Sequence, residues 1–485
     1  MMIKNRYQSI STLLLSFCGI SLLLTSLAFA QKSEHKENES HTITKPMVGH
    51  PEPDAWLREF LKTAAKVPSK KAKKALEKVL KDPQTYKFQL LITEYIKDES
   101  DHVKLIPHSY RVDYEYFYPA SAVKVYGSLA ALRHFTLIKK EYSWLTTDDP
   151  MSQNKKTCKS KDHSNESNQL ASLEHEIKKT ELISSNKAFN TVFNVTGFRT
   201  LHEYILPDFP SVRVFHRLSS RETHQECLKT PSLKICDWTK SGINNKKSYQ
   251  RKRFVSEADI SDLEAKIDLA SPTGFGLNKD SLLVGKAYKH MKTKKIISKP
   301  MDFSFKNRVS FYDFQRMMIG MYLTKEKSPF GPPIQLFNGE PSKGGIRTTW
   351  LRELRHSMAI YPRHSENPKY SGAGLSERRF KPLITGVRLA KGKPVEEQNL
   401  YYLNKAGKAL GFHVDNAFIA TGYKAGHINK KTGYPEGKLK KGFFITVGLY
   451  VNKDQTLNDD KYEYKQISVP VFKALGYAVG QYLKK

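Results

Sequence analysis

The pattern of apolar and polar positions divides the chain into helical and strand-like stretches. Residues 53–81 carry apolar side chains at helical spacing on both sides of Pro68, which predicts two helices. Residues 469–483 show the same spacing and predict a C-terminal helix. Runs rich in apolar, β-branched and aromatic residues predict strands at 86–96, 103–112, 400–404, 413–421 and 443–451.

Strands are thus expected at both ends of the sequence and helices in its middle. The fold class this predicts is α/β: an antiparallel sheet built from both chain ends and flanked by helices, plus an inserted all-α lobe. One domain is expected over residues 51–485, with polar insertions near 146–168 and 220–300. A cleft between sheet and lobe is a natural place for a ligand.

The N-terminal residues have the features of an export signal. Lys4 and Arg6 precede an apolar run over residues 10–27, and Ala28-Phe29-Ala30 offers small side chains at a cleavage site. We expect residues 1–30 to be a cleaved signal peptide, residues 31–50 a flexible leader, and the mature protein to be secreted or periplasmic. A single transmembrane anchor is the alternative, because the run is near the lower length limit for spanning.

Charge is the most unusual feature of the composition. The formal net charge is +32, and removal of Lys4 and Arg6 with the signal leaves +30. Such a field attracts polyanions, so an anionic cell-envelope polymer is a candidate partner; a solvated lysine-rich surface without a dedicated partner is the alternative. No nucleic acid is expected, because the expected export signal disfavours it and the lysines are not interleaved with aromatic residues.

No metal or other cofactor is expected, because the sequence has neither a zinc-helix motif nor a glycine-rich nucleotide loop. After signal removal three cysteines remain, Cys158, Cys227 and Cys236. Their odd number argues against a scaffold built on disulfides. Cys227 and Cys236 are close enough in sequence to close a small loop, but the sequence does not decide the pairing.

The first chemical motif is Ser121-x-x-Lys124, which follows an aromatic-proline lead-in and opens an apolar helix. One helical turn separates the two residues, so the amine lies beside the hydroxyl. A lysine desolvated in a pocket has a lowered pKa and can accept the serine proton. The spacing also occurs at Ser152 and at Ser184, and the alternative is a core helix whose lysine extends to solvent.

Two further motifs follow along the chain. Ser184-x-Asn186 is the second, and a helix N-cap is its alternative interpretation. Lys-x-Gly at a strand is the third. We favour Lys405-Ala406-Gly407 over Lys424-Ala-Gly, and we interpret the literal Lys431-Thr-Gly as part of a hairpin loop.

These three motifs, in this order, resemble the class A β-lactamase-like serine hydrolases of the serine β-lactamase and penicillin-binding-protein superfamily. The resemblance runs from about residue 51 to the C-terminus. It implies that Lys124 takes the proton of Ser121, which attacks a carbonyl to give an acyl-enzyme. It further implies that Ser184 relays a proton to the leaving nitrogen and that Asn186 orients the substrate amide.

The resemblance also implies roles for the third motif. Lys405 would supply positive charge near Ser184 and to an acidic group of a small-molecule or peptide substrate. Ala406, Gly407 and Lys408 would line the substrate, and the backbone N–H groups of Ser121 and Lys408 would form an oxyanion hole.

This sequence departs from the family pattern in three places. Ala406 replaces a hydroxyl residue, Ser185 replaces an aspartate, and no Glu-x-x-Leu-Asn motif supplies a deacylating base. Glu222 is the candidate for that base, and a surface carboxylate is its alternative interpretation. The favoured function is an exported serine hydrolase that cleaves an amide or ester of the β-lactam or cell-envelope peptide class. The alternative is a catalytically weak or inactive relative that binds an anionic envelope polymer.

Overall fold

Both ends of the described chain contribute strands to one antiparallel sheet. The fold is described from a computed structural model. The residues that it describes are 51–100, 102–153, 157–158, 170–219, 224–239, 242–252, 279–324, 328–370, 377–391, 400–421 and 441–484. The expected signal peptide and leader lie outside these residues. All of the described residues belong to one compact unit, Val48–Lys485.

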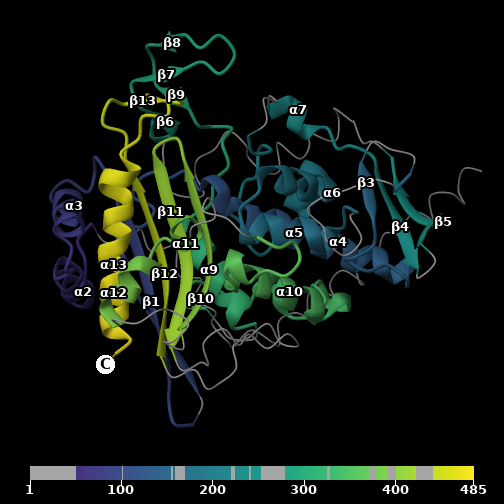
Figure 1. Cartoon of the computed structure of the whole chain (residues 1–485), viewed down its shortest axis with the longest axis horizontal. Coiled ribbons are helices and arrows are strands. Elements are labelled where there is room, and N and C mark those ends of the chain that lie inside the picture. Colours follow the sequence, from purple (N-terminus) through teal and green to yellow (C-terminus); the bar gives the residue numbers. More distant parts are fainter. Residues whose placement is uncertain are drawn as a thin grey trace, which may run out of the picture. The chain divides into compact units, whose positions relative to one another are not determined.

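The sheet has five strands in the order β10-β11-β12-β1-β2 (Figure 1). Neighbouring strands are antiparallel throughout. Its strands are β1 (Gln89–Lys97), β2 (Val103–Tyr110), β10 (Leu400–Ala409), β11 (Phe412–Thr421) and β12 (Lys441–Tyr450). The three C-terminal strands are buried on both faces, which explains their nearly continuous apolar sequences. β10 is an edge strand and extends beyond the predicted residue 404 to Ala409.

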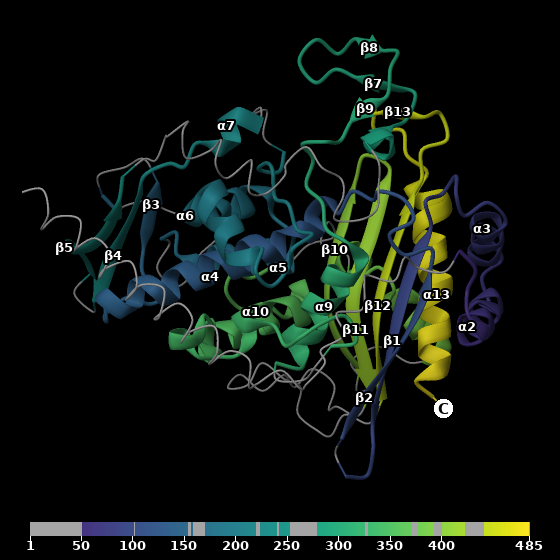
Figure 2. The same cartoon turned by 180° about the vertical axis from the view of Figure 1, so that it is seen from behind.

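Helices from the two ends of the chain cover one face of the sheet (Figure 2). They are α2 (Ala55–Ala65), α3 (Lys70–Lys81), α12 (Ile384–Lys391) and α13 (Val469–Tyr482). The sequence predicted α2, α3 and α13 within a few residues. Their apolar stripes pack with alternate strand residues such as Leu90, Ile92 and Tyr402 in one continuous core. Asp54 and Ser69 cap α2 and α3 through their side chains.

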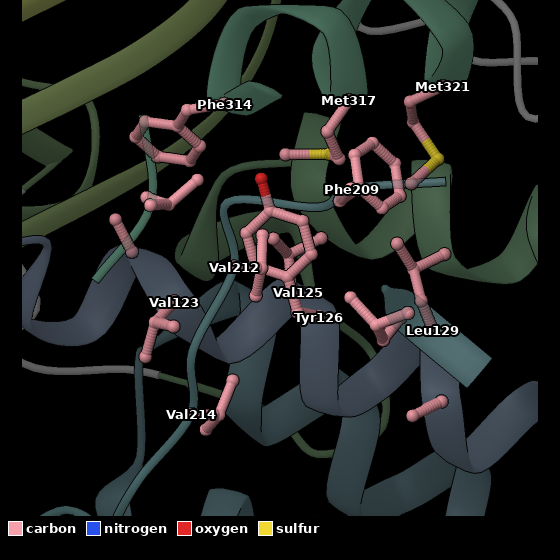
Figure 3. Close-up of a cluster of buried hydrophobic side chains, with 14 of the residues drawn as sticks. Val123, Val125, Tyr126, Leu129, Phe209, Val212, Val214, Phe314, Met317 and Met321 are labelled. Atoms are coloured by element: carbon pink, nitrogen blue, oxygen red, sulfur yellow. The ribbon is translucent and has the colours of Figure 1, made fainter. Parts of the chain in front are cut away.

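A second core lies on the other face, where the middle of the chain returns to the sheet. Its helices are α4 (Lys124–Glu141), α5 (Leu173–Leu182), α6 (Asn186–Ile205), α9 (Phe311–Tyr322) and α10 (Thr348–Ala359). α4 is buried on nearly all sides, as its apolar sequence requires. Figure 3 shows its Tyr126 ring among apolar side chains of neighbouring segments, and that ring meets Phe209 edge-on at 5.3 Å. This packing holds α4, which begins at Lys124 of the Ser121-x-x-Lys124 motif, in position.

The middle of the chain is not entirely helical. A three-stranded antiparallel sheet, in the order β3-β4-β5, lies there with the helices. Its strands are β3 (Met151–Gln153), β4 (Leu233–Thr239) and β5 (Gly242–Arg251). The prediction of an all-α lobe is therefore not confirmed. The stretches interpreted as insertions contain these strands, and the lysines and asparagines of β5 conceal the strand pattern because none of its residues is fully buried.

The cysteines pair differently from the loop considered from the sequence. Cys158 and Cys236 form a disulfide that joins positions 78 residues apart, and Cys227, which is buried, is not part of it. The bond ties the segment after β3 to β4. Proximity in sequence was a poor guide here because strand pairing, not loop length, brings Cys158 and Cys236 together.

The remaining elements are short. In the part of the chain that the structure describes they are α7 (His224–Leu228), α11 (Glu377–Phe380), β6 (Leu283–Val284), β7 (Ala287–Lys289), β8 (Ile296–Ile297), β9 (Met301–Asp302), β13 (Thr456–Leu457), 3-10 turns (Ala120–Val123, Lys279–Leu282, Gln335–Phe337, Pro341–Lys343 and Pro362–His364) and a π-helical turn (Tyr464–Ser468). Among the described residues, no helix is both long and apolar enough to cross a bilayer.

Candidate active site

Ser121 lies in a 3-10 turn, η1 (Ala120–Val123), which leads directly into α4. Pro119 stands before the turn, and Ala120 adopts a left-handed backbone with φ 49°. This strained, sharp entry sets the direction of the helix start. Ser121 is half-buried, whereas the other three residues of the turn are buried. The hydroxyl-bearing residue is therefore the member of the turn that solvent reaches.

Lys124 begins α4 and is fully buried. Its Nζ donates to Oδ1 of Asn186 at 2.7 Å, to Oγ of Ser184 at 3.1 Å and to the Ser184 carbonyl. Burial, reinforced by the charge of Lys405, holds the pKa of this amine well below its usual range. The alternative of a lysine extending to solvent is thus wrong. The amine is therefore desolvated and held by groups of Ser184 and Asn186.

Ser184 and Asn186 come from the connection between α5 and α6. Ser184 has a left-handed backbone, φ 57°, which turns both its hydroxyl and its carbonyl toward Lys124. Asn186 opens α6 and also donates from Nδ2 to Oγ of Ser219 at 2.5 Å. The intervening Ser185 is the N-cap of α6, accepting from the Ala188 N–H. The alternative N-cap interpretation is therefore correct for Ser185, while its two neighbours face the lysine.

Lys405 is buried in β10 and has an internal counter-ion. Its Nζ donates to the carbonyls of Thr180 at 2.5 Å and Glu181 at 3.2 Å, and lies 3.2 Å from Oε2 of Glu181. The other carboxylate oxygen of Glu181 accepts from the Ser128 hydroxyl at 2.7 Å. Burial lowers the pKa of Lys405, and Glu181 opposes that shift. The end of α5 is therefore bound both to the strand and to α4.

Gly407 brings β10 against the turn that carries Ser121. A Cβ atom on Gly407 would lie 2.0 Å from the Pro119 carbonyl oxygen and 2.8 Å from the Ala122 nitrogen. These contacts are far inside van der Waals distance, so only glycine allows this approach. Pro119 and Ala122 flank Ser121, which places the serine beside the strand.

β10 has some backbone donors that do not pair with β11. Leu410 and Gly411, with φ 52° and 83°, form a two-residue hairpin turn that makes Ala409 and Phe412 a hydrogen-bonded pair. Alternation along an antiparallel ladder then directs the N–H groups of even-numbered residues, Lys408 included, away from β11. The carbonyl of Tyr402, another even-numbered residue, also points away from β11. It accepts a hydrogen bond from the Lys381 amine at 2.7 Å, which agrees with this alternation.

The other predicted site residues are placed less centrally. Ala406 and the Lys408 side chain point to the opposite face from Lys405, and the Lys408 ammonium lies 5.3 Å from the centre of the Tyr464 ring. Lys408 can therefore serve the site through its backbone N–H. Glu222 lies outside the described residues, as do the discarded candidates Lys424 and Lys431.

Sequence reasoning missed Glu181 and Arg379. Glu181 closes the charge network between Lys405 and Ser128. Arg379, in α11, is exposed, and its charge contributes to the lowered pKa values of Lys124 and Lys408. No spacing rule could have indicated either residue. Each acts on the site lysines from an element whose position depends on tertiary packing.

The arrangement holds the parts of an acyl-transfer site. It has a hydroxyl on a half-buried residue at a helix start, a desolvated amine one turn away, a second hydroxyl and an amide on that amine, and an adjacent strand with N–H groups that point away from β11. Such groups can form an ester with a carbonyl carbon and stabilise the oxyanion that develops. Strained serines at φ 57° (Ser184) and φ 53° (Ser219) border this group.

No protein-family model and no curated protein matches the chain. Among solved structures, it is similar to a β-lactamase from Sphaerobacter thermophilus DSM 20745, with 11% identity over 86% of this chain and 96% of that one and a TM-score of 0.37. It is also similar to a variant of the last common ancestor of Gram-negative class A β-lactamases (10% identity, 84% and 96% coverage, TM-score 0.37) and to PBP-A (10%, 86% and 97%, 0.33). At these identities and TM-scores the likeness assigns no activity to this chain.

Proposed function

We propose that the protein is an exported serine hydrolase that forms an acyl-enzyme on Ser121. The observation that carries the proposal is the buried Lys124 amine, one helical turn from Ser121 and within 3.1 Å of the Ser184 hydroxyl and 2.7 Å of the Asn186 amide oxygen. A lysine with a lowered pKa is partly neutral and accepts a proton from a nearby hydroxyl. The expected export signal supports an envelope location.

In the proposed reaction, Lys124 takes the Ser121 proton while the serine oxygen attacks an amide or ester carbonyl. The N–H groups of Ser121 and Lys408 stabilise the resulting oxyanion, by about 3 kcal/mol per donor. Ser184, hydrogen-bonded to Lys124, passes the proton to the leaving nitrogen or oxygen. Asn186 orients the substrate amide.

The acidic group of a β-lactam or envelope peptide would meet Arg379 rather than Lys405. The Lys405 ammonium already faces the Glu181 carboxylate, so its charge is neutralised inside the protein. Arg379 is exposed, and the chain beside it is anchored because the Phe380 carbonyl accepts from Asn404 at 2.7 Å. Arg379→Gln should raise the KM for acidic acyl donors and leave that for uncharged esters unchanged.

Labelling with a fluorescent penicillin and with a fluorophosphonate tests the proposal. Both probes should label the wild type, and Ser121→Ala should abolish labelling without loss of folding. Ser152→Ala is the matched control. Ser152 has the same spacing to a following lysine, and its buried hydroxyl has no hydrogen-bond partner among the described residues. Failure of every acylating probe to label the wild type would instead favour the non-catalytic relative that binds an anionic envelope polymer.

A further inference from the structure

A cationic hairpin lies well apart from the candidate active site in the sequence. Residues 286–299, here called the lysine hairpin, contain β7, β8 and the turn between them. They include six lysines and no aspartate or glutamate. In both views β7 and β8 project beyond the ends of β10 and β11 (Figures 1 and 2).

The same hairpin exposes apolar side chains. Ile296 is 55% exposed and Met291 is 49% exposed, the highest values for any large apolar residue that the structure describes. Scattered single apolar residues on a surface are ordinary, but two on one short hairpin among lysines are not. Leu283 and Phe305, at 46% and 48%, flank the hairpin in sequence.

Backbone hydrogen bonds hold this turn in shape. His290 N–H donates to the Lys295 carbonyl at 2.8 Å, and Lys294 N–H donates to the His290 carbonyl at 2.9 Å. At the base, β13 pairs with β7, and the Asn458 amide donates to the Lys289 carbonyl at 2.9 Å. Because the turn is already ordered, its side chains can meet a partner with little further loss of entropy.

We propose that the lysine hairpin docks the protein on an anionic lipid surface. The lysines would lie against phosphate headgroups, and Met291 and Ile296 would enter the boundary of the acyl chains. A purely ionic polymer would need the lysines but would have no use for the two apolar side chains. The turn between β7 and β8 carries three lysines and no carboxylate, whereas the acidic residues Asp459 and Asp460 belong to the segment that follows β13.

Vesicle binding of the mature chain, beginning after Ala30, tests this proposal. The chain should bind vesicles containing phosphatidylglycerol and not those of phosphatidylcholine alone, and added salt should weaken binding. Replacing the three turn lysines, Lys292, Lys294 and Lys295, by glutamine should weaken it about 100-fold, at about fivefold per lysine. A triple lysine-to-glutamine variant at Lys70, Lys71 and Lys74, which are exposed on α3, removes the same charge and should change binding little.

The apolar side chains provide the decisive comparison. Met291→Ser with Ile296→Ser should weaken binding by at least about tenfold, whereas Leu389→Ser, an exposed apolar residue of α12, should not. The emission of Met291→Trp should shift to shorter wavelength on anionic vesicles. The proposal is overturned if the wild type does not bind, if the α3 variant loses as much affinity as the turn variant, or if only the lysine variants lose it. The last outcome would assign the hairpin to a polyanion.

Discussion

Glu181→Gln tests the charge network behind the candidate site. The variant removes the counter-ion that lies 3.2 Å from the Lys405 amine, in a pair whose side chains are 2% and 0% exposed. Removing one partner of a buried ion pair leaves an uncompensated charge and costs about 3–5 kcal/mol. We therefore expect the free energy of unfolding at neutral pH to fall by about that amount.

The pH dependence should change with a definite sign. Glu181 raises the pKa of both Lys124 and Lys405 against the effect of burial, so its removal lowers both values further. A lysine whose folded pKa lies below its unfolded value binds fewer protons when folded, so the stability of the variant should rise with pH toward 10. If neutral Lys124 is the base, the acid side of the pH profile for Ser121 labelling should also move to lower pH in the variant.

Thermal unfolding from pH 6 to 10 and the pH profile of Ser121 labelling measure these effects. Glu203→Gln is the control, because Glu203 pairs with Arg199 at 2.7 Å on the surface and its loss should cost less than about 1 kcal/mol. Glu181→Leu combined with Lys405→Met should be more stable than Glu181→Gln, since the double variant removes both charges of this buried pair. Stability and pH profiles of Glu181→Gln equal to those of the control would refute the reasoning. An unlabelled wild type would refute the proposed function alone, because the unfolding measurements need no activity.

Three further predictions concern other parts of the fold. Gly407→Ala should cost about 1–3 kcal/mol and slow labelling of Ser121, because the new methyl group meets the Pro119 carbonyl oxygen; unfolding and labelling rates check it. Replacing Cys158 and Cys236 by serine should destabilise the oxidised protein by about 4 kcal/mol, given the 78-residue separation, and have no further effect under reducing conditions. Burial raises the pKa of Asp415 to about 6, so the stability that the protonated carboxyl contributes is lost as pH rises through 6. Relative to wild type, Asp415→Asn should therefore gain stability between pH 4 and 7. A difference in melting temperature between the two proteins that stays constant over this pH range would contradict this.

Local elements could be predicted because they depend on local spacing. The apolar stripes of α2, α3 and α13 and the apolar strands β11 and β12 are visible in sequence, since period and burial are linked. The strands β4 and β5 were missed because β5 is polar, has no fully buried residue and is held by pairing with β4. Residues 220–300 therefore resembled an unpatterned insertion.

In the candidate site, too, local spacing could be predicted from the sequence and long-range contacts could not. The sequence by itself determined that Ser121 and Lys124 share a helical turn, because 3.6-residue periodicity requires it. Only the tertiary structure decided that Lys124 is buried, that Ser184 and Asn186 meet its amine, and that Glu181 neutralises Lys405. Burial and long-range charge pairing depend on which elements pack together, and residues more than 200 positions apart, such as Glu181 and Lys405, carry no local signal of that packing.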